Sequence, residues 1–538
     1  MSLSGLFDIG RSALFASQTG LYVTGHNIAN VNTPGFNRQE VILETTTPVV
    51  TGAGFTGRGV RVAGIRRYFD RFIYNQIFFQ SQKIGLTRTM SNIMTGIEET
   101  FNDLKGAGLS GALQEFYSAW QEVSSSPDLL PARNLLLAKA DSFLRIAKEM
   151  EGAIKNTLND IERQIRYSTE KINSLLKQIG DLNGKILQVE SGLLSEKAKD
   201  LRDQREEALR RLSELIDISY YEEENGSVTV NHGTFALVER ENVSMLSAPV
   251  KRDGRRGVFI NGQDITDTIR QGELGGLLLS RRDIENYQLF GLRRLIGSVI
   301  KEINLQHRQG YGLDGTTGED FFTPVKLYLD NYTQGAVASA TITDMSQLTL
   351  DEYEITFTSG NYTVRSIQTA NVVASGIYIS GNPISFDGIE VTVTGSVLQN
   401  ERIVISPLKN LIKEAEVAII DPLKIAASSS GSTIPLDNLN ALRIVNLFES
   451  SIPELGYSTF FEYYNELVST TGIMSRNAQD SLKFEENLMA ELTRQRDALS
   501  GVNLDEEAVN LIKYQRAFEA GARIIKVADE LLETILNI

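Results

Sequence analysis

Few residues in this chain of 538 have the types and the spacing that catalysis or metal binding requires. The sequence contains no cysteine, which excludes disulfides, thiolate nucleophiles and cysteine-based metal sites. Its three histidines are His26, His232 and His307. No two of them stand at a short metal-ligand spacing, so we interpret them as ordinary surface or core residues and expect neither a metal site nor a cofactor.

Two further patterns could be mistaken for catalytic or nucleotide-binding motifs. Acidic neighbours such as Glu98 and Glu99 are expected by chance among 68 acidic residues, and no G-x-S-x-G turn accompanies them. The segment GAGFTG, with Gly52, Gly54 and Gly57, satisfies G-x-G-x-x-G. A dinucleotide site needs this pattern between a strand and a helix, whereas the strand-like RGVRVAGI follows it here, so we interpret it as a flexible loop. The sequence therefore points away from an enzyme.

Charge and hydrophobicity narrow the possible partners. The net charge of −15 leaves no general attraction to nucleic acid or to anionic membranes. No stretch reaches the roughly 18 apolar residues of a membrane span. Asp8 and Arg11 interrupt the first apolar segment, so we expect no cleaved secretory signal.

The two ends of the chain carry matching apolar repeats with a step of seven residues, which is the period of a helix that keeps one face toward a partner helix. We call these nine residues the terminal seam: Phe7, Leu14, Leu21, Ile28, Leu504, Leu511, Phe518, Ile525 and Leu532. Burying one such side chain stabilises by roughly 1.5 to 3 kcal/mol, whereas ordering each residue's backbone costs about 1 to 2 kcal/mol. We therefore expect the ends to be loose in the monomer and to gain order by packing against copies of themselves.

A turn motif follows the first repeat, and we call it the corner motif: Asn30, Asn32, Thr33, Pro34, Gly35 and Phe36. Pro34 cannot continue a helix, and Gly35 permits the backbone of a tight turn. The sequence predicts that the first helix ends here.

Between the ends the periodicity changes. Residues 41–65 are β-branched and interrupted by glycine, which predicts short extended segments. Residues 66–124 and 131–216 predict long helices, including DLRDQREEALRRLSELI, in which Glu207 and Arg211 stand at a favourable i,i+4 spacing. Short strands and a helical return follow.

The pattern of residues 320–407 is almost wholly β-like, and helical patterns resume near 409–418 and dominate from residue 437 onward. The sequence thus predicts an α+β multidomain protein with coiled-coil-like helices at both ends, a middle domain of long bundled helices and an inserted all-β outer domain. Because an inserted unit brings the two halves of its frame together, we expect the termini to pair. The predicted inner domain comprises 1–60 and 500–538, the middle domain 61–319 and 408–499, and the outer domain 320–407.

Several segments resemble the bacterial flagellar rod, hook and hook-associated proteins. ALFASQTGLYVTGHNIANVNTPGFNRQE resembles the N-terminal signature of that family, GRGVRVAGIRRYFD the segment after it, and SGVNLDEEAVNLIKYQRAFEAGARIIKVADELLETIL its C-terminal helix. DLRDQREEALRRLSELIDI, GELGGLLLSRRDI and GYGLDGTTGEDFF are similar to segments of the hook-associated proteins in particular. The resemblance covers most of the chain except about 325–410.

The resemblance implies a structural subunit that assembles on the hook tip and forms the hook-filament junction, with the corner motif sending the chain outward from an inner-core helix. Implied partners are copies of the chain in a ring, the hook protein, the second junction protein and a dedicated export chaperone. The family's chaperone holds the C-terminal helix, which here presents Leu511, Tyr514, Phe518, Ile525 and Leu532. Type III export without a cleaved signal implies an extracellular place in the flagellum. The alternatives are another axial subunit, hook or rod, and a secreted enzyme or carbohydrate-binding module in the β insertion.

Overall fold

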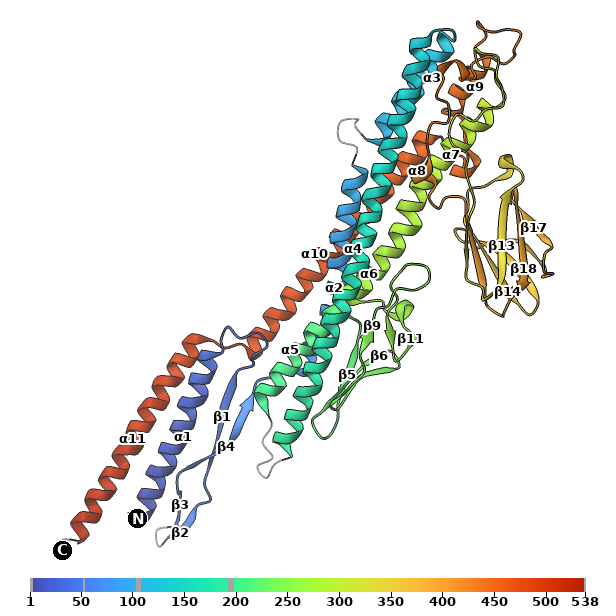
Figure 1. Ribbon diagram of the computed structural model, residues 1–538. Helices are drawn as coiled ribbons and strands as arrows, with labels where there is room; N and C mark the ends of the chain where they lie inside the picture. Colours follow the sequence, from blue (N-terminus) through green and yellow to red (C-terminus); the bar gives the residue numbers. More distant parts are fainter. Residues whose placement is uncertain (1–2, 52–53, 103–107, 192–197, 537–538) are drawn as a thin grey trace.

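The computed structural model describes residues 3–51, 54–102, 108–191 and 198–536. They form an elongated molecule in which the two terminal helices lie side by side at one end, long helices make up the body, and two β units lie along one flank (Figure 1). The α+β architecture that the sequence predicted is confirmed.

The terminal helices α1 (Leu3–Ala29) and α11 (Leu504–Leu536) run antiparallel, so that both chain ends lie at the same tip of the molecule (Figure 1). A short arm follows α1, and we define it as residues 39–67. In the arm, β1 (Gln39–Thr45) pairs with β4 (Val60–Arg67), and β2 (Val49–Thr51) pairs with β3 (Gly54–Thr56). The first of these sheets crosses residue 60, where the inner domain was predicted to end.

The G-x-G-x-x-G segment lies in the β2–β3 hairpin of the arm. Gly52 lies outside the described residues, Gly54 begins β3, and strand β4 follows. No helix opens after the glycines in this described stretch, so the segment lacks the strand-to-helix setting that a pyrophosphate site needs.

The body is a bundle of long helices, with α6 and α7 joined by a π-helical turn at Ile284–Leu289. Its helices are α2 (Arg71–Phe101), α3 (Leu109–Ser125), α4 (Leu130–Glu190), α5 (Lys199–Leu215), α6 (Gly272–Asp283), α7 (Phe290–His307), α9 (Leu439–Leu447) and α10 (Phe460–Ser500). The 61 residues of α4 span about 90 Å. A stripe of fully buried isoleucines, including Ile165, Ile172 and Ile179 at steps of seven, holds α4 against its neighbours.

The body's core is continuous and, toward its far end, aromatic. Phe116 stacks on Phe143 with ring centroids 5.8 Å apart, and Phe321, Phe322 and Phe448 close around Phe116 at 5.8 to 6.1 Å. Such rings bury large apolar areas in fixed geometry, which makes this end of the bundle rigid.

Two β units flank the bundle. In the first, β5 (Ser219–Glu222), β6 (Val228–His232), β7 (Phe235–Glu239) and β8 (Asn242–Val243) form one sheet, and β9 (Leu246–Ser247), β10 (Phe259–Ile260) and β11 (Gln263–Asp264) form another. The second unit is the predicted insertion and also has two sheets, ordered β12-β19-β14-β15-β16 and β13-β18-β17. Its strands are β12 (Tyr328–Asn331), β13 (Gly335–Ile342), β14 (Tyr353–Thr358), β15 (Asn361–Ser366), β16 (Val372–Ile377), β17 (Pro383–Phe386), β18 (Ile389–Ser396) and β19 (Arg402–Ser406).

One helical prediction was wrong in extent. Of residues 409–418, only α8 (Leu411–Glu414) is helical, and Val417 instead bridges Phe322 in an extended conformation. The apolar spacing of this segment is compatible with a helix and with extended chain. The bridge to Phe322, which precedes the insertion, selects the extended conformation.

Candidate assembly surfaces

In the contact between α1 and α11, glycines of each helix pack against larger side chains of the other. A Cβ atom added to Gly20 would lie 2.5 Å from the ring of Tyr514, and one added to Gly10 would lie 2.6 Å from Ile525. On the other helix, a Cβ added to Gly521 would lie 3.3 Å from Leu14. The glycines therefore let the two helices approach more closely than side chains of any size would allow.

This contact uses a helix face that differs in part from the terminal seam. The buried positions of α11 are Glu507, Gly521 and Ala528, and Tyr514 completes the same step of seven. Each of these four positions stands three residues after a seam residue of α11. Among the seam residues, Ile525 of α11 approaches Gly10, and Leu14 of α1 approaches Gly521. The role of the seam in packing between copies of the chain stays a prediction.

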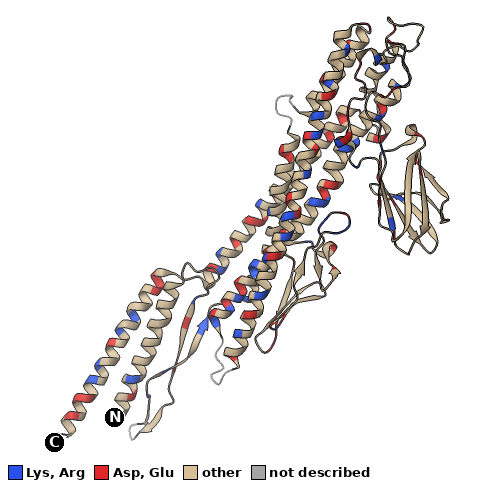
Figure 2. Ribbon diagram, in the orientation of Figure 1, with Lys and Arg blue, Asp and Glu red and all other residues tan. Residues whose placement is uncertain are grey.

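The seam residues of α11 consequently form an open apolar face. Leu504, Leu511, Phe518 and Leu532 are each between 37% and 51% exposed. The seam residues of α1, which are Phe7, Leu14, Leu21 and Ile28, are partly buried. α1 has Asp8 and Arg11 as its only acidic or basic residues besides His26, so most of its surface is uncharged (Figure 2). Both terminal helices thus keep apolar surface that nothing in the described residues covers.

Helix α1 ends at Ala29, just before the turn that contains Pro34 and Gly35, as the sequence predicted. Asn30 donates from Nδ2 to the carbonyl of His26 at 3.0 Å, which satisfies a carbonyl in the last turn of the helix. The hydroxyl of Thr33 then donates to Asn30 Oδ1 at 3.0 Å. Gly35 has φ of +78°, a conformation that other residues adopt only with strain.

Two asparagines that the sequence reasoning did not select, one on each side of the turn, fix the path of the chain after it. Asn27, which is 1% exposed, donates to the carbonyl of Gln39 at 2.8 Å and accepts from the Gln39 amide at 3.0 Å. Asn37 donates from Nδ2 to Asp203 on α5 at 2.6 Å, and its amide donates to the same carboxylate at 3.1 Å. Gln39, at the start of the arm, is therefore bonded to α1, and Asn37, just before the arm, is bonded to the body.

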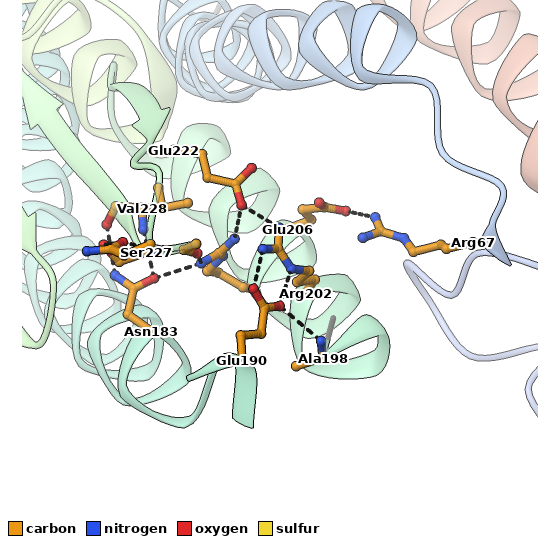
Figure 3. A network of polar contacts seen from close by, with 12 residues as sticks. Arg67, Asn183, Glu190, Ala198, Arg202, Glu206, Glu222, Ser227 and Val228 are labelled. Carbon is orange, nitrogen blue, oxygen red and sulfur yellow. Dashed lines mark hydrogen bonds and ion pairs between the residues drawn. The ribbon is translucent and has the colours of Figure 1, made fainter. Parts of the chain in front are cut away.

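A buried ionic cluster, which we call the joint, holds the arm against α5. It consists of Arg67, Asp203 and Glu206. Arg67 Nε lies 2.7 Å from Asp203, and the same guanidinium pairs with Glu206 (Figure 3). Side-chain exposures of 6% to 14% keep water from screening these charges.

Burial raises the pKa of both acids of the joint, and the excess of negative over positive charge adds to the rise. Burial raises the pKa of Asp203 to about 6, against the opposing effects of Arg67 and Asn37. Burial likewise raises the pKa of Glu206 to about 7, and repulsion by Asp203 adds to the rise. Further groups that influence these two pKa values are Asp200 and Arg205 on α5. The joint can therefore bind a proton near neutral pH.

The opposite side of α5 is bonded to the first β unit. Arg202 forms a two-pronged pair with Glu190 at 2.7 and 2.8 Å and also contacts Glu222 on β5 (Figure 3). Asn183 on α4 donates to the carbonyl of Val228 at 2.8 Å and accepts from its amide at 3.0 Å. The predicted pair of Glu207 with Arg211 is confirmed at 2.8 Å. Helix α5 thus connects the arm, the bundle and the β unit.

A second connection runs to α11. Arg38 lies 2.7 Å from Glu506 and 3.0 Å from Glu507, at the start of that helix. Its amide donates to the carbonyl of Ser500 at the end of α10, at 3.0 Å. Glu507 is 2% exposed, so this ion pair fixes where α11 begins.

The three histidines lie far from one another in structure as in sequence. His26 is 3.7 Å from Asp200, and His232 lies 3.3 Å from Asp217. His307 accepts from the Ala426 amide at 2.8 Å, and burial lowers its pKa to about 4. Across the described ranges, no three His, Asp or Glu side chains are grouped to hold a metal ion. Within the same ranges, no helix combines the length and the apolar character that crossing a membrane requires.

Sequence reasoning missed the joint because its partners stand far apart in the chain. Arg67 and Asp203 are separated by 136 positions, and surface ion pairs of the same types are common. Asn27 carried a usable signal, because it is a polar residue on a helix face otherwise lined by small residues such as Gly20 and Ala16. A buried polar side chain is normally hydrogen-bonded, and that expectation would have selected it.

Four family models match consecutive parts of the chain. The model described as "Flagellar hook-associated protein FlgK helical domain" matches residues 94–322, and "Flagellar hook-associated protein 1, D2-like domain" matches 329–407. "Flagella basal body rod protein" matches 7–37, and "Flagellar basal body rod FlgEFG protein C-terminal" matches 495–538.

Curated relatives match over their whole length. The chain is 28% identical to flagellar hook-associated protein 1 of Escherichia coli K12, and the match covers 100% of both chains. It is 26% identical to the protein of that name from Bacillus subtilis, over 98% of this chain and 97% of the relative. A solved structure, that of the flagellar hook junction protein FlgK from Burkholderia pseudomallei, matches in fold with a TM-score of 0.69. That match has 16% identity and covers 79% of this chain and 100% of the other. Along its whole length the chain is thus similar to flagellar hook-associated protein 1, a structural protein of the bacterial flagellum.

Proposed function

We propose that this chain assembles on the tip of the flagellar hook as a ring of identical copies and forms the hook-filament junction. The observation that carries the proposal is the open apolar face of α11, in which Leu511 and Phe518 remain 37% and 39% exposed after α1 has packed against the other side. A face of this kind on a long helix needs a partner in water. Identical subunits related by rotation supply one for every copy.

The remaining features fit such a subunit. The corner motif and the joint set the direction in which the terminal pair leaves the body, and neighbouring copies pack regularly only if that direction is the same in each. The open face, with Leu511, Phe518 and Leu532, also fits an export chaperone that binds it before assembly by an amphipathic helix-in-groove contact, whereas Tyr514 and Ile525 of the predicted chaperone set face α1 in the folded chain. The place of action is the exterior of the cell, reached by type III export.

The β insertion of residues 320–407 is proposed as the outermost domain. The match of the helical-domain model to residues 94–322 favours a hook-associated subunit over a hook or rod subunit. We assign no catalytic or carbohydrate-binding role to the insertion.

Adding purified protein to isolated hooks and imaging their tips by negative-stain electron microscopy tests the proposal. The unmodified chain should add a collar to the hook tip. The variant Leu511→Asp with Phe518→Asp should not, because two carboxylates would be buried without partners in the assembled face. A matched control, Ile377→Asp with Leu398→Asp, alters residues of the β insertion that are 74% and 56% exposed, and should assemble normally. Unmodified protein that leaves hooks bare, or a seam variant that assembles as well as the control, would contradict the proposal.

A further inference from the structure

The end of the body opposite the termini carries a second exposed apolar surface, which we call the tip platform. It is built from the α3–α4 turn, the segment before residue 425 and the start of α9, which lie together at the upper end in Figure 1. Its members are Leu129, Leu130, Leu423, Leu436, Leu439 and Leu442, each between 38% and 80% exposed. A group of exposed leucines gathered at one end of a protein marks an interaction site.

The platform is rigid because a buried arginine joins its segments. Arg133, which is 1% exposed, donates from Nε to the carbonyl of Pro127 at 2.7 Å. Its Nη1 donates to the carbonyls of Pro422 and Ile425 at 3.1 and 2.7 Å. From α9, the Nδ2 of Asn438 donates to the carbonyl of Ser124 at the end of α3.

The Ser- and Gly-rich loop that presents Leu436 is also ordered. Asp437 accepts from the amide and hydroxyl of Ser429, both at 2.7 Å, and from the hydroxyl of Thr433 at 2.9 Å. Its other oxygen accepts from the Leu439 amide at 2.9 Å. These bonds hold the pKa of Asp437 well below its usual range, so the carboxylate stays ionised and keeps the loop in one conformation. The leucines are thus held outward at little entropic cost to a partner.

The rim of the platform is mainly acidic, with Arg443 on α9 as an exposed basic residue. Asp128, Asp314 and Asp421 are exposed at its edges. Burial lowers the pKa of Arg133 to about 10, and the nearby carboxylates of Asp128 and Asp314 oppose this fall. The nearby Lys424 is already paired with Glu319 at 2.6 Å. The surface therefore suits a partner whose apolar side chains are flanked by Lys or Arg.

We propose that the tip platform is the docking surface for the adjacent axial protein of different sequence, a partner that presents apolar side chains flanked by basic ones. The inference rests on the proposed function. Rotation about a ring axis gives every platform the same position and direction along that axis, so the copies of one ring do not pair platform to platform. A second copy of this chain is a poor occupant, because it has a net charge of −15 and the same acidic rim.

The test uses the purified second hook-filament junction protein of the same organism as the probe. Its binding to hooks already carrying this chain is measured by cosedimentation against probe concentration. The variant Leu436→Asp with Leu439→Asp should still form the collar on hooks but should bind the probe more than roughly 100-fold more weakly, since it buries two unpaired charges. The control Ile377→Asp with Leu398→Asp should bind like the unmodified chain.

The acidic rim gives an independent test. Asp128→Lys should weaken probe binding while leaving collar formation and the melting of the body unchanged, and binding of the unmodified chain should weaken as salt rises. Probe binding that is unaffected by the leucine variant would overturn the inference and leave the proposed function standing. A leucine variant that no longer reaches the hook tip would also overturn it, because the platform would then contact the hook. Failure of the unmodified chain to decorate hooks would instead count against the proposed function itself.

Discussion

Lowering the pH from 8 to 5 should tighten the docking of the arm on α5, although acid weakens most ion pairs. Burial raises the pKa of Asp203 from 3.8 to about 6 and that of Glu206 from 4.5 to about 7. When the arm leaves α5, both carboxylates enter water and regain their ordinary pKa values. Between about pH 4.5 and 7 the docked state therefore holds more protons than the undocked state. Stability falls with rising pH wherever the docked state holds more protons, so docking weakens as the pH rises through this window.

The magnitude follows from the same pKa values. The first proton to bind should account for most of the pH effect on docking. Once one carboxylate is protonated, Arg67 faces a single remaining carboxylate, which stays ionised. For a group whose pKa is about 7 when docked and 4.5 when undocked, linkage gives on the order of 2 to 3 kcal/mol more docking free energy at pH 5 than at pH 8. This corresponds to a docking constant that is larger by roughly one to two orders of magnitude.

The absence of cysteine makes the measurement direct, since two introduced thiols can be labelled without competition. A chain with Thr47→Cys in the arm and Gln204→Cys on α5 would carry a donor and an acceptor dye. The urea concentration at which energy transfer falls by half would then be followed from pH 8 to pH 5, and it should increase on acidification. In the same labelled chain, Asp203→Asn with Glu206→Gln removes the titrating groups and should give a nearly flat pH profile. The reasoning fails if the unmodified midpoint stays constant or decreases as the pH falls, or if the double variant keeps the full dependence.

Further perturbations test the terminal helices and the corner. Gly20→Val should prevent the close packing of α1 on α11, because a Cβ there meets the ring of Tyr514, so the collar on hooks should be lost while the melting of the body is unchanged. Replacing Pro34 and Gly35 with alanine should let α1 continue and misdirect the arm, so cells should export the protein yet swim poorly, and normal swimming would contradict this role for the corner. Hydrogen exchange of the dilute monomer should be fast across residues 3–31 and 505–535, whereas strong protection would show that the ends are ordered alone. Deleting residues 504–538 should abolish the collar on hooks and chaperone binding by calorimetry, but leave the cooperative melting of the body intact.

The features that sequence could predict are those with a strong local period. The heptads near both termini, the long apolar stripe of α4 and the β-rich insertion each repeat over enough residues to select one kind of element. The turn at Pro34 and Gly35 was predictable because proline and glycine act on the backbone directly.

What sequence could not predict is which faces meet. The contact between the terminal helices depends on Gly10, Gly20 and Gly521, and a glycine contributes nothing to an apolar pattern although it allows the closest approach. The joint depends on burial, which turns Arg67, Asp203 and Glu206 from ordinary surface charges into a coupled group, and burial is a property of the assembled fold. The extended path near Val417 was likewise decided by a pairing across the insertion.

The antiparallel pairing of α1 with α11 makes completion of the fold depend on the whole length of the chain. In any process that runs from the N-terminus, the small-residue face of α1 is delivered long before α11, which carries the surface that covers it. A chain that is cut short, or that stalls before residue 504, leaves this face open and cannot build the paired end, however well its body has folded. The topology therefore acts as a length check, in which finished molecules alone present a closed terminal pair to their neighbours.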